Sequence, residues 1–454
     1  MAAPSANVLS IRGRRSNPTS ENTMNKTKLT PFATTLVLSA ISAVYGQDAK
    51  PVATVENASA PQWLQDTFDG KIPEALAKGK FNLNARLRYE YADAQDTSPS
   101  HAPTIRARFG FTSAPVYGFQ GMLEGETIQA IGDRDNYGLP GGVSGPGKTI
   151  VADPVLTQLN QAWLSYSNWK TTLKGGRQRI KLDNDRFIGN VGWRQNEQTY
   201  DAVYLQSKYV DDLTFNYGYL WEVNRIFGDV LPPAATRDFT SDSHIINVSY
   251  TGLPFGKLTG YSYILAFENS GGNSTATYGA NFSGSQPVGA EGAVKLGYWL
   301  EYAHQTGHRN QTTPGFDADY YKIEGSGTAK GFTLGGGYEV LGSDGGAKGF
   351  GTPLATLHAH NGWADAFLAT PATGLTDAYA FAGTKLPGDV PVKVVYHKFD
   401  ADFGGGDHGY ELDFVASKAL GKHWKATAKY AWLDGKAPVT VDTQKLWLEI
   451  EFNF

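Results

Sequence analysis

The chain has 454 residues, with 40 Lys and Arg against 44 Asp and Glu, so its formal net charge is −4. It contains no cysteine, which excludes a disulfide scaffold and every cysteine-based metal, iron–sulfur or redox site. The even charge balance argues against a general nucleic-acid binder. A mean hydropathy of −0.34 excludes a bundle of membrane-spanning helices, each of which needs about 20 apolar residues in a row.

Glycine and aromatic residues are both abundant, with 53 Gly and 13% Phe, Trp and Tyr. Low hydropathy together with many aromatic residues is typical of a transmembrane β-barrel, because only every second strand residue of such a barrel meets lipid. The composition therefore favours an all-β membrane protein.

Residues 24–46 have the features of a secretory signal peptide. Lys26 and Lys28 give a charged start, an apolar stretch covers 31–44, and small or aliphatic residues occupy the positions before Gln47 that a signal peptidase reads. A single anchor helix is the alternative, but the apolar run is too short for it. We therefore interpret 1–23 as an upstream extension from a misplaced start, and 47–80 as a periplasmic lead-in with a short helix near 73–79. Removal of 1–46 leaves 35 basic and 43 acidic residues, a net charge of −8.

From residue 81 onward the hydrophobic period is two. In 81–91 one face is apolar and the other carries Asn, Arg and Glu, as expected for a strand with different surroundings on its two sides. A soluble β-sandwich alternates in the same way. A barrel is favoured because several segments reach about 10 residues, the bilayer-crossing length, because Tyr and Trp concentrate near segment ends, and because the chain stops inside a strand at Phe454.

Connection lengths predict the number of strands. Bacterial single-chain barrels have an even number of strands, joined alternately by long outer loops and short periplasmic turns. Seventeen segments are strand candidates. Their connections alternate between long and short from the first long loop, 92–104, but two long connections, 268–290 and 304–318, then follow each other. An extra strand at 276–283 restores the alternation. The sequence thus predicts an antiparallel up-and-down transmembrane barrel of 18 strands over 81–454, with both termini periplasmic and 16 strands as the alternative.

The polar faces of these strands would line the lumen, and they are rich in charge. An 18-stranded barrel is wide enough for an aqueous channel, and guanidinium groups bind carboxylates in bidentate fashion. We predict an anion path; the alternative is that these residues form ion pairs in the wall without touching solute. The predicted lumen residues are Arg86, Arg88, Arg106, Arg108, Glu124, Glu126, Lys174 and Arg177.

A dense polar and aromatic motif spans 175–203, across one strand end, a long outer loop and the next strand. Rings under a pyranose and amides at its hydroxyls would suit sugar recognition. The alternative is a loop that only packs inward and stiffens the barrel. Its predicted solute-binding residues are Arg186, Trp193, Arg194, Gln195, Gln198 and Asp201.

A second motif, 351–377, lies in the longest outer loop. His358, His360 and Asp365 are metal-ligand types, but a His-x-His pair without a clear third ligand is a weak signal, so we predict no metal site. A loop folded over the pore is the better interpretation, with Trp363 and Phe367 as its small core.

Four stretches resemble the alginate export family of outer-membrane barrels: RLRYE at 86–90, TIRARFGF at 104–111, and the two long motifs. The resemblance covers most of the chain after the signal. It implies an 18-stranded barrel that passes a polyanionic uronate polymer through a lumen rich in Arg and Lys.

The functional prediction is an outer-membrane channel for anionic or carbohydrate solutes, including a polysaccharide such as alginate. One alternative is a non-conducting barrel for adhesion or anchoring. Another is a polysaccharide-acting enzyme, because Glu124 and Glu126 share a strand face, although no nucleophile elbow, phosphate loop or zinc signature is present. We predict no catalytic residue and no cofactor. The expected partners are outer-membrane lipid, the solute and the barrel assembly machinery, which would read Phe454; we expect a monomer.

Overall fold

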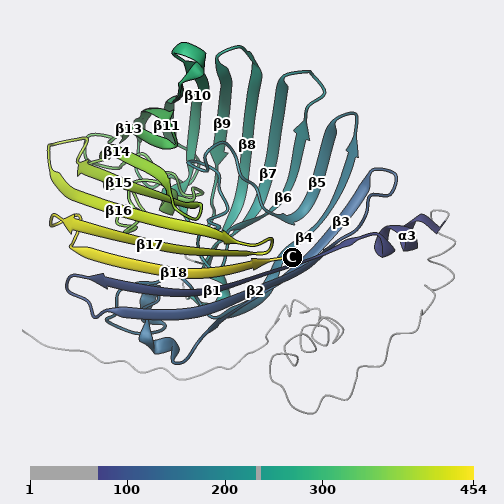
Figure 1. Cartoon of the computed structure of the whole chain (residues 1–454), viewed down its shortest axis with the longest axis horizontal. Helices are drawn as coiled ribbons and strands as arrows, with labels where there is room; N and C mark the ends of the chain where they lie inside the picture. The colour runs from purple at the N-terminus through teal and green to yellow at the C-terminus, as the bar shows by residue number, and fades with distance from the viewer. Residues whose placement is uncertain (1–69, 232–236) are drawn as a thin grey trace, which may run out of the picture. The chain divides into compact units, whose positions relative to one another are not determined.

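The structure is a computed structural model that describes residues 70–231 and 237–454 (Figure 1). The predicted extension 1–23, the predicted signal peptide 24–46 and most of the lead-in 47–80 lie outside this part. The described chain opens with helix α3, Lys71–Ala77, close to the helix predicted near 73–79. Within 70–231 and 237–454 no helix is both long and apolar enough to cross a bilayer.

Eighteen antiparallel strands follow the helix. Their bounds are β1 Lys80–Ala94, β2 Ser100–Thr112, β3 Phe119–Ala130, β4 Leu156–Asn168, β5 Thr171–Gln178, β6 Thr199–Ser207, β7 Leu213–Asn224, β8 Asp238–Leu253, β9 Gly256–Leu265, β10 Thr275–Val288, β11 Val294–Gly307, β12 Asp317–Ala329, β13 Phe332–Leu341, β14 Leu375–Leu386, β15 Val390–Asp400, β16 Asp407–Leu420, β17 Trp424–Gly435 and β18 Thr443–Asn453.

The strands follow one another around a ring in chain order, and β18 pairs with β1 to close it (Figure 1). The closing register places Arg86 opposite Glu451 on one side and opposite Arg106 on the other. Beyond the last strand residue, the Phe454 N–H donates to the Leu83 carbonyl at 2.9 Å, and the Leu83 N–H donates back at 3.1 Å. Closure leaves no sheet edge unpaired, as a barrel in lipid requires.

The predicted strand count is confirmed. The strand inferred from connection lengths at 276–283 is β10, Thr275–Val288, so the 16-stranded alternative is excluded. One predicted connection is wrong, because the long first loop 92–104 is only 95–99. There β1 and β2 keep pairing as far as Ala92 opposite Ser100, which lengthens both strands beyond their clearly alternating part.

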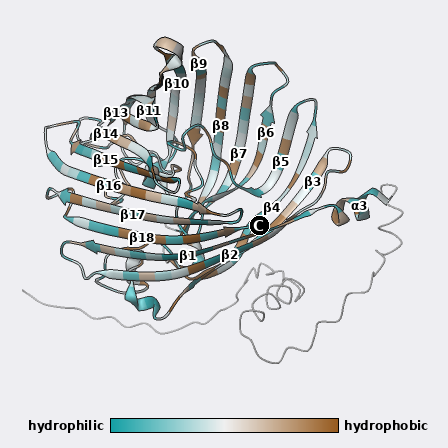
Figure 2. Ribbon diagram, viewed as in Figure 1, coloured by the Kyte–Doolittle hydropathy of each residue, from teal (hydrophilic) through white to brown (hydrophobic). Residues whose placement is uncertain are grey.

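Hydrophobic and hydrophilic residues alternate along the strands (Figure 2), and the exposed large apolar side chains lie on the outer face. Outward-facing Leu87, Leu300 and Ile323 keep 45%, 46% and 55% of their surface exposed. Such exposure is stable only against lipid, since large contiguous apolar surfaces are rare on soluble proteins. Aromatic residues lie near both ends of the strands, as in the interfacial girdles of membrane barrels. The ring centroids of Phe119 and Tyr166 are 4.8 Å apart at one end, and those of Tyr410 and Trp432 are 5.6 Å apart at the other.

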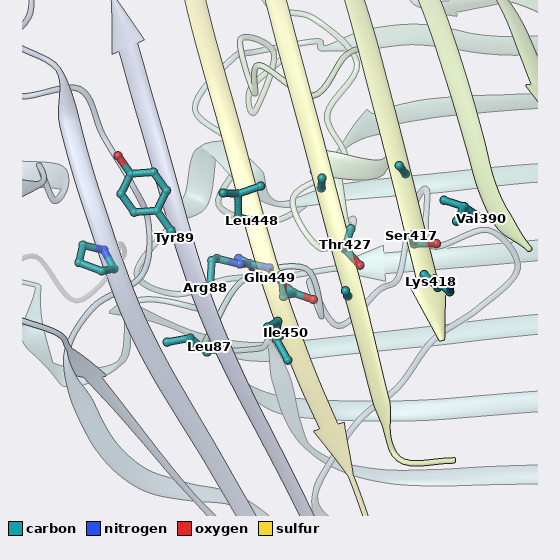
Figure 3. A pocket seen from close by; sticks show the side chains of 14 residues that line it. Leu87, Arg88, Tyr89, Val390, Ser417, Lys418, Thr427, Leu448, Glu449 and Ile450 are labelled. Atoms are coloured by element: carbon teal, nitrogen blue, oxygen red, sulfur yellow. Dashed lines mark hydrogen bonds and ion pairs between the residues drawn. The ribbon is translucent and has the colours of Figure 1, made fainter. Parts of the chain in front are cut away.

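A shallow groove of about 590 Å³ crosses the outer wall from β15 over β16, β17, β18 and β1 to β2 (Figure 3). Its sides are formed by large apolar side chains such as Leu448 and Ile450. The small residues Ala416, Ala426 and Ala428 also line it. The groove belongs to the lipid-facing surface and not to the lumen.

Two loops turn into the barrel instead of standing above it. We call the segments 179–198, between β5 and β6, and 342–374, between β13 and β14, the inner loops. Phe187 of the first packs against Tyr261, Tyr320 and Phe350, with ring centroids 5.1, 5.4 and 6.1 Å away. A hydrophobic core therefore forms inside the lumen, between the inner loops and the wall.

Candidate channel constriction

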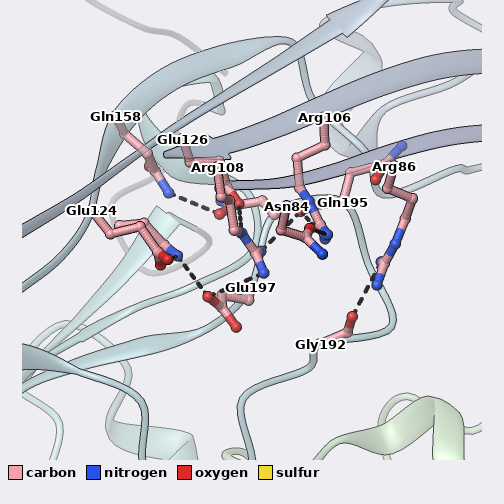
Figure 4. Close-up of polar contacts among 12 residues, drawn as sticks. Asn84, Arg86, Arg106, Arg108, Glu124, Glu126, Gln158, Gly192, Gln195 and Glu197 are labelled. Atoms are coloured by element: carbon pink, nitrogen blue, oxygen red, sulfur yellow. Dashed lines mark hydrogen bonds and ion pairs between the residues drawn. The ribbon is translucent and has the colours of Figure 1, made fainter. Parts of the chain in front are cut away.

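Arginines from β1 and β2 hold the backbone of the first inner loop (Figure 4). Arg86 donates to the carbonyls of Gly192 and Trp193 at 3.2 and 3.1 Å, and Arg88 donates to the Trp193 carbonyl at 2.5 Å. Strand alternation places these arginines on the inner face in consecutive layers. Both arginines thus hold the loop backbone at Trp193.

The next strand continues the same arrangement. Arg106 and Arg108 both donate to the Gln195 carbonyl, at 3.3 and 3.2 Å (Figure 4). The four arginines of β1 and β2 are at most 8% exposed. Their guanidinium groups are therefore used to position the loop and are almost closed to solute.

Buried acids compensate these guanidinium charges. Arg88 pairs with Glu449 at 2.7 Å, and Arg108 pairs with Glu126 and, at 3.3 Å, with Glu197. Burial raises the pKa of Glu197, but Arg108 and Arg179 outweigh it and lower the pKa to about 2. A buried charge is tolerable only when it is paired, and this cluster meets that condition.

Glu124 joins the other end of the same network. It accepts from Arg179 at 2.8 Å and from the amides of Asn160 and Gln161 at 2.8 and 2.9 Å. Arg179 keeps about a third of its side chain exposed. This arginine, at the start of the first inner loop, is therefore the open end of an otherwise closed network.

The two inner loops are joined by ion pairs across the lumen. Arg194 pairs with Glu90 of β1 at 2.9 Å and with Asp365 of the second inner loop at 2.6 Å. Arg186 pairs with Glu339 of β13 at 2.9 Å and donates to Asn361 at 3.0 Å. The loops and both walls thus form one interlocked unit.

An aromatic stack lies beside these ion pairs. Trp193 stacks on His358 with centroids 4.6 Å apart and planes 5° apart, and the Arg88 guanidinium lies 4.4 Å from the Trp193 centroid. His358 contacts Asp365 at 2.7 Å and Lys429 at 2.6 Å. Burial lowers the pKa of His358 to about 3, which keeps its ring neutral.

The structure brings together most of the predicted site residues. Gln195 donates its side-chain amide to Thr104 at 2.9 Å, and Gln198 donates to the carbonyls of Gly189 and Leu354 at 3.0 and 3.2 Å. These contacts hold the loop inward. The two amides are thus hydrogen-bonded within the protein, and His358 covers one face of the partly buried Trp193 ring, which are the contacts of an inward-packed loop.

Two predicted lumen residues lie on the other face. Arg177 and Asp201 form a bidentate pair, at 2.7 and 2.9 Å, on the face of the exposed Leu173 and Val203. Their prediction as lumen residues is corrected. Lys174 does face the lumen, where its ammonium lies 4.4 Å from the centroid of Trp163.

Several residues that contact the first inner loop or its partners were not among the predicted site residues. Lys429 and Glu449 occupy polar faces of alternating strands, so the period of two could have identified them. Asp153 accepts from the Gln195 N–H at 2.8 Å. It lies in the loop 131–155, and no sequence pattern marks it.

A closed 18-stranded barrel with an apolar outer belt, aromatic girdles and a polar, loop-filled interior defines a bacterial outer-membrane β-barrel of the channel class. The chain belongs to the alginate export family, whose sequence model, described as "Alginate export", matches residues 78–338. No curated protein matches the chain.

Solved structures with the same fold are distant in sequence. OccK9 (OpdG) of Pseudomonas aeruginosa has 15% identity and a TM-score of 0.66, covering 84% of this chain and 100% of its own. OpdK of the same organism, solved with vanillate, has 14% identity and a TM-score of 0.66, covering 84% and 99%. OccAB3 of Acinetobacter baumannii has 14% identity and a TM-score of 0.64, covering 83% and 100%.

Proposed function

We propose that this protein is a passive outer-membrane channel for anionic or carbohydrate solutes, including uronate polysaccharides such as alginate. The observation that carries the proposal is the closed barrel with exposed cations on the inner side, beside the first inner loop. Around the first inner loop, Arg179, Lys181 and Lys257 keep 32%, 55% and 33% of their side chains exposed. Because these cations are partly exposed, a solute carboxylate can reach them, whereas it cannot reach the buried arginines.

The comparisons support the proposal. The family description names alginate export, and alginate is a polymer of carboxylate-bearing sugars. One structural neighbour was solved with vanillate, which also carries a carboxylate. A passive channel for carboxylate-bearing solutes is the function that both findings share.

Planar-bilayer recording of the purified full-length protein tests it. We expect stepwise conductance, a reversal potential in a KCl gradient that shows anion preference, and partial block by oligouronates. Absence of steps in repeated insertions, verified by heat-modifiable migration of the reconstituted barrel, would overturn the proposal.

A second candidate function is a non-conducting barrel for adhesion or anchoring. One observation favours it, namely that Arg186 and Arg194 link the inner loops to opposite walls through buried ion pairs. A variant with 351–372 replaced by a Gly-Ser linker separates the candidates in a liposome-swelling assay with sugars. Swelling by both proteins supports a channel; swelling only by the variant supports a lumen that the wild-type loop closes.

We also propose the processing and assembly of the chain. Residues 24–46 act as a signal peptide, 1–23 are an upstream extension, 47–80 are a periplasmic lead-in, and the barrel is a monomer. Phe454, 71% exposed beside the closing seam, is the residue that the assembly machinery reads. Phe454→Ser should lower the fraction of heat-modifiable barrel in the outer membrane, and light scattering in detergent should give a monomer mass.

We propose no catalytic role for any residue. Glu124 and Glu126 are each 2% exposed and occupied by Arg179 and Arg108. Incubation of the purified protein with oligouronates should therefore release no product.

A further inference from the structure

Two aromatic rings lie against the inner wall below the second inner loop. Tyr379 and Phe381 of β14 pair with Gly337 and Gly335 of β13. A Cβ atom on Gly337 would lie 2.5 Å from the Tyr379 ring, and one on Gly335 would clash with the Phe381 ring. The rings therefore occupy the space that side chains of β13 would fill, and only glycine allows this arrangement.

A hydrogen bond and an ion pair fix one end of this ring pair. The Tyr379 hydroxyl donates to Glu324 at 2.5 Å, and Lys322 pairs with Glu324 at 3.6 Å. The Lys322 ammonium also lies 5.4 Å from the Tyr379 centroid. This cation has a counter-charge, so it serves to hold the ring.

Lys393 of β15 is different. Its ammonium lies 4.5 Å from the centroid of Phe381. Within residues 70–231 and 237–454 it makes no hydrogen bond and no ion pair within 4 Å, although it is exposed on the inner face. A cation–π contact at an exposed site contributes only about 0.5–1 kcal/mol. The ammonium is therefore free to exchange the ring for an anion.

The ring pair is next to the constriction. Asp377, two residues before Tyr379 on the same face, accepts from Asn361 of the second inner loop at 3.2 Å. By contrast, the arginines of β1 and β2 are already bound to the first inner loop. A solute that passes the inner loops thus meets Lys393 and the two rings on this wall.

We propose that Lys393, Phe381 and Tyr379 form a binding station for a solute that carries a carboxylate on a ring, which deepens the proposed channel function and rests on it. The solute carboxylate takes the Lys393 ammonium away from Phe381. The face of the Phe381 ring that the ammonium uncovers then packs against the apolar face of the solute ring. Two sources share this chemistry, a uronic acid and an aromatic acid.

Current block in planar bilayers tests the station, with glucuronate and benzoate as the two ring carboxylates and with acetate and glucose as probes that lack the ring or the carboxylate. Lys393→Gln should raise the half-blocking concentration of a ring carboxylate about tenfold, equivalent to about 1.4 kcal/mol. Phe381→Leu should weaken the current block by ring carboxylates and leave the block by acetate unchanged. Lys418→Gln is the matched control, because Lys418 borders the groove on the outer wall.

The outcomes separate the two proposals. Conductance with block unchanged by Lys393→Gln, or weakened equally by Lys418→Gln, overturns the station and leaves the channel standing. Loss of block for only one of glucuronate and benzoate supports the station and identifies its source. If the barrel does not conduct, saturation-transfer NMR of glucuronate and benzoate on wild-type and Lys393→Gln protein decides; equal transfer to both proteins overturns the station.

Discussion

Buried arginines in this barrel act as structural ties. Arg88 is 1% exposed, yet it contacts the carboxylate of Glu449, the Trp193 carbonyl and the Trp193 ring. Removing such a charge from water costs several kcal/mol, which is recovered only when ion pairs and hydrogen bonds of good geometry replace the lost hydration. These partners come from two separate chain segments, β18 and the first inner loop, so Arg88 specifies how these segments meet β1.

Arg194→Gln should loosen both inner loops. The substitution leaves Glu90 buried without its cation and leaves Asp365 with the Lys445 cation alone, at 3.3 Å, at a cost of about 3–5 kcal/mol. Limited proteolysis within 179–198 and 342–374 should accelerate accordingly. Lys170→Gln is the control, because the Lys170–Asp211 pair is 64% and 88% exposed and contributes about 0–1 kcal/mol. Equal cleavage of Arg194→Gln and wild type would contradict the structural role.

At this scale the sequence predicts the face of a residue but not its partner. Alternation put Arg86 and Arg108 on the inner face, where the structure has them. Their partners are loop carbonyls about 90 to 110 residues away in the chain. No period reveals such contacts, because they depend on how an irregular loop folds inside a barrel that must already be closed.

Strands are the elements that the sequence predicts best. Their period of two is imposed by lipid on one side and water or loops on the other. Arg177 shows the limit, since it lies three residues from Lys174 and strict alternation already places the two on opposite faces. Its charge predicts a position in the lumen, whereas an ion pair with Asp201 stabilises it on the outer face at the end of the strand.

A basic residue in the middle of the outer face should destabilise the barrel. Ile323 is the central residue of β12 and is 55% exposed to lipid. Ile323→Arg should cost about 2–4 kcal/mol, measured as unfolding midpoint in urea from lipid vesicles. Ser326→Arg on the inner face of the same strand is the control and should shift the midpoint little. Similar losses for both variants would mean that lipid does not cover the Ile323 face.

Residues 70–231 and 237–454 form a closed barrel around the two interlocked inner loops. Strand number and closure follow from connection lengths, so the sequence predicts them. It predicts a loop over the pore, but not that two loops interlock through Arg194 and Asp365. That contact joins segments from opposite halves of the chain, and only the closed barrel brings them together.

Acidification should destabilise the packing of the two inner loops inside the barrel. Burial lowers the pKa of His358 and of His360 to about 3, and Arg108 and Arg179 lower the pKa of Glu197 to about 2 against the effect of its burial. When the folded-state pKa lies below the unfolded value, the unfolded chain binds more protons, so stability decreases as the pH falls. The histidine contributions are lost progressively below about pH 6.5, and that of Glu197 below about pH 4.5.

Single-channel recordings at pH 7.5, 5.5 and 4 check this expectation. Conductance fluctuations should become more frequent at each step down in pH. His358→Gln removes one of the two histidine contributions and should weaken the change between pH 7.5 and 5.5. A fluctuation rate that does not vary with pH would show that these groups do not control the loops.

The longest connection of the barrel, 342–374, turns inward and covers Phe350 and Leu354 completely. Much of it is therefore withdrawn into the barrel, although Leu368 stays 50% exposed. An antibody or a phage tail that approaches the cell therefore meets mainly the segment 131–155 and short rim connections such as 401–406 and 436–442. Immune and phage pressure would fall on those segments, while the residues that meet inside the barrel are shielded from it.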